Sequence, residues 1–310
     1  MIKVSVVFDI VRYLNYHIIT SLKVSSTKLL VDWVWYNTRE LSLQEDFVGR
    51  IKLTIEYDGS SFCGWQRQQT DDALFRGEDL LEAKPSVQGV LEYACWKMGG
   101  GYVLVEGAGR TDAGVHALAQ VAHVDFPRPI KPEQLMAGLN FYLQSTGAVV
   151  KAAEEVSDSF HARFSAKARL YRYRILNRRA PSALWRTRAW HVPAELDIGA
   201  METAANCFLG THNFQAFRAA ACQSRSPIKT LDRFEITTEG DFIECAVKAR
   251  SFLHNQVRIM VGTLVWIGKK KIPMTIVQEA LERGDRTQVG PTAPPYGLYL
   301  AGVEYDEEGR

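Results

Sequence analysis

The stretch Glu106-Gly-Ala-Gly-Arg-Thr-Asp-Ala-Gly-Val-His116 sets one carboxylate, Asp112, among three glycines and one arginine, Arg110. Glycine carries no side chain, so a bulky charged partner can approach this backbone closely. An aspartate in such a loop, with a cation two residues away, is typical of a reactive group. The stretch therefore predicts a functional loop centred on Asp112.

Other interpretations of the Asp112 loop remain open on these residues alone. Aspartate and glycine both favour turns, so the stretch is also compatible with an ordinary turn. A phosphate-binding P-loop would need a following Gly-Lys-Ser/Thr, and the glycine spacing differs from that of dinucleotide-binding loops. A glycosidase would need a second carboxylate facing the first, which the loop does not supply. A catalytic carboxylate kept ionised by Arg110 is the most specific interpretation.

Regular patterns on both sides of the loop predict helices and strands in mixed order. A strand over Val103–Val105 leads into the loop, and Ala119–Phe126 is expected to form the next one. Mixed order with neighbouring strands favours an α+β fold on a largely antiparallel sheet. We further predict strands over Lys52–Tyr57, Leu170–Leu176, Asp232–Thr237 and Phe242–Ala249, helices over Ser86–Gly99, Pro132–Leu143, Ile198–Leu209 and Leu253–Trp266, and a loop over Gln69–Pro85.

Two residues of the second half are further candidates. Tyr171 lies on the strand Leu170–Leu176, where a tyrosine is either a half-buried sheet residue or a stacking platform for a base. Arg258 lies on the polar stripe of an otherwise apolar helix. A buried arginine there would need an anionic partner, for which Asp112 is the candidate.

The distribution of charge favours a polyanionic partner. The net charge is only +2, yet the stretch 161–194 contains no acidic residue. Aromatic residues interleaved with arginines can stack unpaired bases and hold phosphates, so nucleic acid is preferred over a merely solvated basic face. The basic residues of the stretch are Arg163, Lys167, Arg169, Arg172, Arg174, Arg178, Arg179, Arg186 and Arg188, and its aromatic residues include Phe164, Tyr171, Tyr173, Trp185 and Trp190.

Several classes of protein are excluded by composition. Five scattered cysteines without a Cys-x-x-Cys pair argue against a disulfide framework or a zinc site, and fit a reducing, cytoplasmic compartment. Seven histidines show no metal-ligand spacing beside a carboxylate, so no metal is expected. No apolar run is long enough to cross a membrane. Residues 1–49 lack a clear period and are interpreted as an accessory extension or the product of a start codon assigned too early.

Over about residues 51–305 the chain resembles the bacterial tRNA pseudouridine synthase A family. Several separate motifs occur in the family's order, which makes chance similarity improbable. The departures are the extension at 1–49 and the loop at 69–85, which is longer than usual. The motifs are Glu56-Tyr-Asp-Gly-Ser-Ser-Phe-Cys-Gly-Trp-Gln-Arg-Gln68, Gly109-Arg-Thr-Asp-Ala-Gly-Val-His116, Phe160-His-Ala-Arg-Phe-Ser-Ala-Lys-Ala-Arg-Leu-Tyr-Arg-Tyr173, Ala249-Arg-Ser-Phe-Leu-His-Asn-Gln-Val-Arg-Ile-Met-Val-Gly262, and Asp285-Arg-Thr287 with Thr292-Ala-Pro294 and Gly297-Leu-Tyr-Leu300.

The resemblance implies two related ferredoxin-like (RRM-like) halves, 50–155 and 156–310, around a central basic cleft, usually in a homodimer. It implies isomerisation of uridine to pseudouridine in the anticodon stem-loop of tRNA, without a cofactor. By the same resemblance Asp112 is the catalytic aspartate, Tyr171 the base-stacking tyrosine and Arg258 the basic partner of Asp112, while Arg110 helps to hold the target nucleotide out of its stack. The alternative is a non-catalytic RNA-binding module, in which Asp112 only forms a turn.

Overall fold

A computed structural model describes residues 49–76, 84–99 and 101–306 of the chain. The extension predicted at 1–49 lies outside these residues apart from Gly49, and so do positions 77–83 of the loop predicted at 69–85. Within the described residues, no helix is both long and apolar enough to span a membrane.

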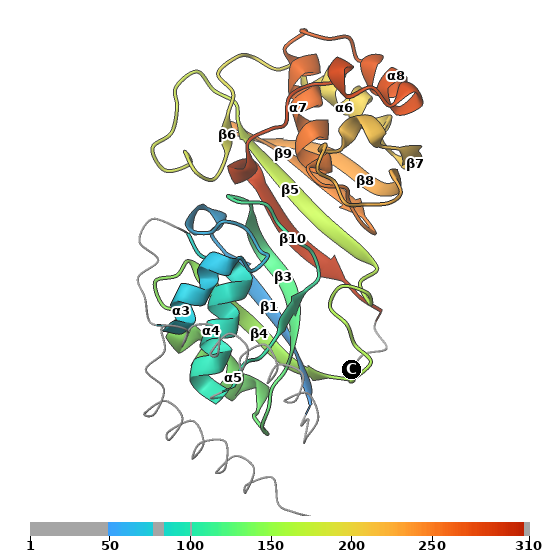
Figure 1. The fold of residues 1–310 in the computed structure, drawn as a ribbon. Helices are drawn as coiled ribbons and strands as arrows, with labels where there is room; N and C mark the ends of the chain where they lie inside the picture. The colour runs from blue at the N-terminus through green and yellow to red at the C-terminus, as the bar shows by residue number, and fades with distance from the viewer. Residues whose placement is uncertain (1–48, 77–83, 100, 307–310) are drawn as a thin grey trace, which may run out of the picture. The chain divides into compact units, whose positions relative to one another are not determined.

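The N-terminal part is an antiparallel sheet with two helices packed against it (Figure 1). Alternation along the first strand explains the packing, since Ile51, Leu53, Ile55 and Tyr57 are buried and their neighbours are not. These side chains meet apolar side chains of both helices in one hydrophobic cluster. The elements are β1 (Arg50–Tyr57), α4 (Val87–Gly99), β2 (Val105–Gly107), β3 (His116–Asp125), α5 (Pro132–Leu143) and β4 (Ala148–Val156), with a short helix α3 (Asp72–Arg76) before α4.

The C-terminal part repeats this arrangement of helices packed against antiparallel strands. Its core is a second hydrophobic cluster, in which the buried face of the helix around Met260 packs against Tyr173 and Ile175. The elements are β5 (Ala168–Leu176), β6 (Trp190–His191), α6 (Ile198–Asn206), β7 (Gly210–Asn213), β8 (Ile228–Glu239), β9 (Phe242–Ala249), α7 (Gln256–Gly268), α8 (Ile276–Arg283) and β10 (Leu298–Glu304).

One continuous sheet joins the two parts in the order β4-β1-β3-β10-β5-β9-β8-β7. The junction is the parallel pairing of β3 with β10, in which Tyr299 lies opposite His116 and Leu300 opposite Ala117. The order β4-β1-β3-β2 on one side of it matches the order β10-β5-β9-β8 on the other. The mixed elements and the mostly antiparallel sheet confirm the predicted α+β fold class.

The structure confirms some predicted bounds and corrects others. Pro132–Leu143 and Phe242–Ala249 have the predicted limits. The strand predicted at Val103–Val105 instead covers Val105–Gly107, because its pairing with β3 runs up to the Asp112 loop. The prediction of a loop over 69–85 was wrong at its start, where the chain forms a 3-10 turn and α3.

The two helices predicted around the second core have other limits: α7 runs over Gln256–Gly268, so its prediction began too early and ended too soon, whereas the prediction for α6 ended too late. The helix predicted at Leu253–Trp266 begins at Gln256, because Asn255 has a left-handed backbone (φ 64°) and the Leu253 N–H donates to the Gln256 side chain. The helix predicted at Ile198–Leu209 ends at Asn206. Strands β4 and β10 and helix α8 were not predicted.

Replacing Gly262 by alanine is expected to destabilise the fold by about 1–3 kcal/mol through overpacking. An added β-carbon would lie 1.8 Å from the carbonyl oxygen of Pro291, which is backbone and cannot rotate away. Urea denaturation followed by circular dichroism measures the change. Gly302→Ala is the matched control because nothing lies within 4 Å of its β-carbon position. Equal stabilities of the two variants would contradict the prediction.

Candidate active site

A cleft of about 1210 Å³ contains all four residues that the sequence singled out. Small-molecule pockets usually measure about 300–1,000 Å³, so this one has room for part of a larger molecule. Its walls come from the Asp112 loop, from β5 and from the segment that leads into α7. Among the lining side chains, Arg110, Arg163, Arg169, Lys229, Arg250 and Arg258 are basic, whereas only Glu106 and Asp112 are acidic.

Backbone contacts fix the Asp112 loop. Asp112 forms an antiparallel bridge with Gly64, and the Trp65 N–H donates to the Thr111 carbonyl at 3.0 Å. The Tyr57 hydroxyl and the Thr111 hydroxyl are 2.8 Å apart in the core. Gly114 has a φ of 79°, a conformation that favours glycine. The loop is thus a rigid support rather than a free surface turn.

Two cationic or proton-bearing side chains hold the Asp112 carboxylate. Arg258 Nη1 donates to one oxygen at 3.0 Å, and His254 Nε2 lies 3.2 Å from the other. The carboxylate is 31% exposed and therefore open to the cleft, while the Arg258 side chain is only 14% exposed. The Arg258 contact is a charge-assisted hydrogen bond, which fixes the direction of the carboxylate.

Arg258 is itself positioned by two further contacts. Its Nε donates to the Ala293 carbonyl at 2.8 Å, and its Nη1 donates to the Asn255 side chain at 2.7 Å. Asn255 has a positive φ and immediately precedes α7, the helix that carries Arg258. The anionic partner inferred for Arg258 from its place on an apolar helix is thus found at Asp112.

Tyr171 and Arg110 both line the cleft, but the Tyr171 ring packs against a neighbouring ring whereas Arg110 is exposed. The Tyr171 ring packs edge-on against Phe252, with 5.2 Å between ring centroids. Burial, and then the nearby Asp112 charge, raise the pKa of Tyr171 to about 12, so the phenol is neutral at neutral pH. Arg110 is exposed, and the described residues offer it no hydrogen bond or ion pair. The prediction that Arg110 is the cation beside Asp112 is therefore wrong, since Arg258 takes that place. Tyr171 therefore suits stacking, and Arg110 is available to an incoming anion.

Sequence reasoning gave His254 and Asn255 no role, although both polar residues lie close to Arg258 in the sequence. Their contacts with Asp112 and Arg258 assign them to the site. The available signal was position, since both lie within four residues of Arg258.

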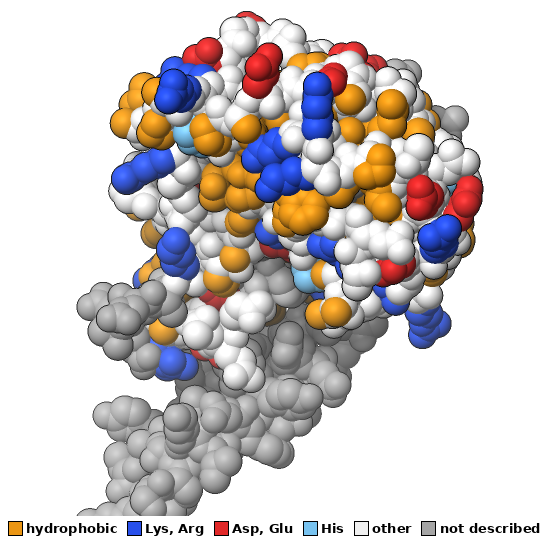
Figure 2. Space-filling view, turned by 90° about the horizontal axis from the view of Figure 1, so that it is seen from above, with side chains coloured by type: hydrophobic (Ala, Val, Ile, Leu, Met, Phe, Trp, Pro, Cys, Tyr) orange, Lys and Arg blue, Asp and Glu red, His pale blue; other side chains and the backbone are white. Residues whose placement is uncertain are grey.

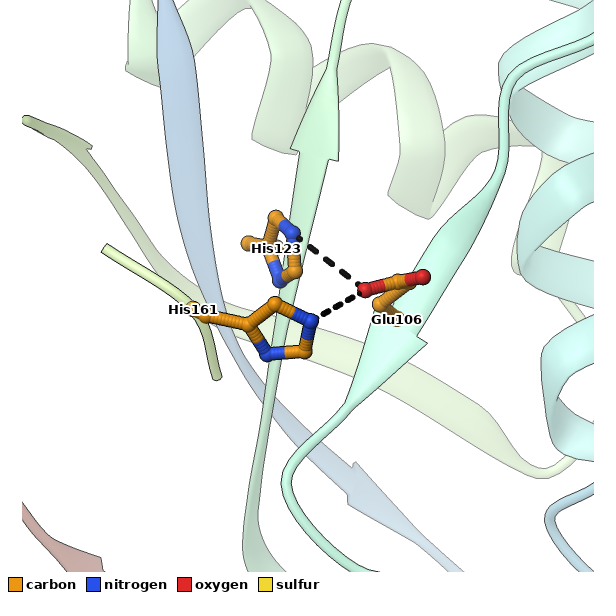
Figure 3. A group of neighbouring side chains, drawn as sticks. All are labelled: Glu106, His123 and His161. Carbon is orange, nitrogen blue, oxygen red and sulfur yellow. Dashed lines mark ion pairs between the residues drawn. The ribbon is translucent and has the colours of Figure 1, made fainter. Parts of the chain in front are cut away.

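A second polar cluster, made of Glu106, His123 and His161, lies at the edge of the cleft (Figure 3). His161 Nε2 is 2.7 Å from Glu106 Oε2, and His123 Nε2 is 3.7 Å from the same oxygen. The three candidate ligand atoms lie within 4.8 Å of one another, a grouping that the spacing of the histidines in the sequence did not predict.

The hydrogen bonds of this cluster do not suit a metal ion. The Nδ1 atom of His123 accepts the Ala162 N–H at 3.3 Å, and that of His161 accepts the Arg163 N–H at 3.1 Å. A metal-bound histidine normally donates its other ring N–H to an acceptor, which is the opposite polarity. With Nδ1 occupied as an acceptor, each neutral ring carries its proton on Nε2 and directs it toward Glu106. The cluster is therefore interpreted as a structural hydrogen-bond network.

Comparisons with known proteins cover most of the residues described above. The tRNA pseudouridine synthase family profile matches residues 53–165 and 204–306, which include Arg110, Asp112 and Arg258 and leave out Tyr171. A tRNA pseudouridine synthase A from Rhodopseudomonas palustris is 50% identical over 256 residues, covering 83% of this chain and 98% of the relative. Proteins of the same name from Afipia carboxidovorans and Paramagnetospirillum magneticum are 48% and 49% identical, over 83% and 84% of this chain and 99% and 96% of their own lengths.

Proposed function

Since the chain belongs to the tRNA pseudouridine synthase family, we propose that it isomerises uridine to pseudouridine in tRNA with Asp112 as the catalytic carboxylate. The observation that carries the proposal is the Asp112 carboxylate, held at 3.0 Å by Arg258 and open to a cleft lined mainly by basic residues.

The reaction needs few catalytic parts. It breaks the bond between the sugar and a ring nitrogen, turns the base and rejoins the sugar to a ring carbon. The carbon loses a proton and the freed nitrogen gains one, so atoms and electrons balance and no cofactor is required. An ionised carboxylate serves either as a nucleophile toward the sugar or base, or as a base toward a sugar proton. The contacts with His254 and Arg258 orient the Asp112 carboxylate, and this orientation is compatible with either role.

The cleft supplies what a flipped nucleotide requires. Taking a base out of its stack costs a few kcal/mol. Stacking on an aromatic ring returns about 1–3 kcal/mol per base, which supports Tyr171 as the platform. Arg110 is exposed and unpaired among the described residues, and we assign it to holding the nucleotide out of its stack. Figure 2 shows Lys and Arg side chains beside hydrophobic ones on the end of the molecule formed by the C-terminal part.

The finer features of the proposal rest on the family. We propose ferredoxin-like halves, which the matching strand orders β4-β1-β3-β2 and β10-β5-β9-β8 support. The predicted boundary at 155/156 falls at the last two residues of β4, just before the segment that leads to β5. A central basic cleft, a target in the anticodon stem-loop, a homodimer and a cytoplasmic location complete the proposal.

Incubating the purified protein with an unmodified tRNA transcript tests the function. We expect pseudouridine in the anticodon stem-loop and no release of free uracil, as read by chemical mapping of pseudouridine and by analysis of the small products. Binding of tRNA without any pseudouridine would indicate a non-catalytic RNA-binding module instead. Release of free base would indicate a glycosidase.

A further inference from the structure

An exposed phenylalanine lies in the wall of the cleft. Phe164 is 73% exposed, the largest value among the described Phe, Tyr and Trp side chains, and it lines the same cleft as Asp112. Its ring lies 4.3 Å from the ring of His161, and the Arg163 guanidinium lies 5.8 Å from its centroid. A bare aromatic face beside a cation is a typical platform for a nucleobase.

The segment that carries Phe164 is held firmly. His161 Nε2, at its base, lies 2.7 Å from the Glu106 carboxylate (Figure 3). The His161 backbone N–H donates to the Ser165 hydroxyl at 2.9 Å. Glu106 lies directly opposite His123 in the pairing of β2 with β3, so the cluster ties the segment to the sheet. A platform fixed in advance loses less conformational freedom when a ligand binds.

Positive charge without an anionic partner gathers next to the platform. Arg169 donates to the carbonyls of Ala108, Arg163 and Arg250 at 2.7–2.8 Å and so draws three segments together. Burial lowers the pKa of Arg169, and the charges of Arg163 and Arg250 lower it further. Across the described residues, none of these three arginines forms an ion pair with a carboxylate. Such a group of like charges is suited to a phosphate.

We propose that Phe164, Arg163 and Arg250 form a second nucleotide-binding subsite of the cleft, occupied by an unpaired nucleotide of the same RNA that presents its target uridine to Asp112. The base stacks on Phe164, and the adjoining phosphate lies between the two arginines. The subsite rests on the proposed function, because that function brings RNA into the cleft. The cleft volume of about 1210 Å³ leaves room for a nucleotide besides the target.

The stacking contact is tested by tRNA affinity in the Asp112→Asn background, where no turnover disturbs the binding measurement. Phe164→Leu keeps an apolar side chain but removes the π-face, and is expected to weaken the Kd about 5- to 150-fold. Phe164→Trp is expected to bind as tightly as the phenylalanine or more tightly. Phe141→Leu is the matched control, since Phe141 is 64% exposed and does not line the cleft.

The phosphate contact has an independent measurement. Arg163→Gln is expected to reduce the slope of log K against log salt by about one, whereas Arg283→Gln, an exposed arginine outside the cleft, leaves it unchanged. Unchanged affinity of Phe164→Leu, or an equal loss in Phe141→Leu, would overturn the subsite. These results stay readable whatever the enzyme does to uridine. If the protein without substitutions forms no pseudouridine in tRNA, that result would instead overturn the proposed function alone.

Discussion

Replacing Asp112 with asparagine is expected to lower the rate of pseudouridine formation by about 10⁴-fold or more. The amide keeps the size of the side chain and one acceptor oxygen, but it replaces the other oxygen with an NH2 donor and cannot act as a nucleophile or accept a proton. The contacts from Arg258 at 3.0 Å and from His254 at 3.2 Å both suit a negatively charged group at this position. Single-turnover assays with excess enzyme measure the rate of the chemical step without product release.

The same variant is expected to bind tRNA within a few-fold of the unmodified protein. One carboxylate facing a polyanion contributes repulsion, so its removal does not weaken the phosphate contacts. Asp72→Asn is a matched control, because Asp72, the first residue of α3, pairs with Arg67 and does not line the cleft. Pseudouridine formed by Asp112→Asn at an undiminished single-turnover rate would show that another residue performs the chemistry.

Local patterns in the sequence predicted elements whose burial is periodic. Pro132–Leu143 repeats apolar residues at helical spacing behind a proline, and Phe242–Ala249 alternates strictly, so both limits were correct. Strand β4 mixes valines with alanines and glutamates, which have low strand propensity, so its composition is ambiguous and its pairing with β1 fixes it as a strand. Strand β10 carries Gly302 at an irregular register and is likewise fixed by its neighbours.

The residues of the site likewise divide into those that the local sequence could identify and those that only the fold brings together. Asp112 and Arg258 were identifiable because each stands in a contiguous stretch of distinctive composition. Glu106, His123 and His161 meet only because β2 pairs with β3 in one register and the segment after β4 folds back over them. The spacing of these residues along the chain could not predict that they come together. The same holds for Phe164, whose exposure depends on how the segment 160–164 is held.

Replacing Arg258 with alanine is expected to lower the single-turnover rate about 10- to 150-fold while changing tRNA affinity much less. Arg258 is 14% exposed and donates to Asp112 from within the protein, so its charge acts mainly on the carboxylate. Hydrogen bonds to charged groups contribute roughly 1.5–3 kcal/mol, which corresponds to that range of rates. The measurement is the rate at saturating enzyme set against the Kd of the same variant.

Arg258→Lys and Arg110→Ala separate the two roles of positive charge in the cleft. Lysine keeps the charge near Asp112 but cannot also donate to the Ala293 carbonyl as Nε does, so an intermediate rate is expected. Arg110 has no partner among the described residues, so its loss is expected to weaken RNA contacts without disturbing the hold on Asp112. An affinity loss without a rate loss in Arg258→Ala would place Arg258 with the RNA contacts. In that case His254 alone would orient the carboxylate.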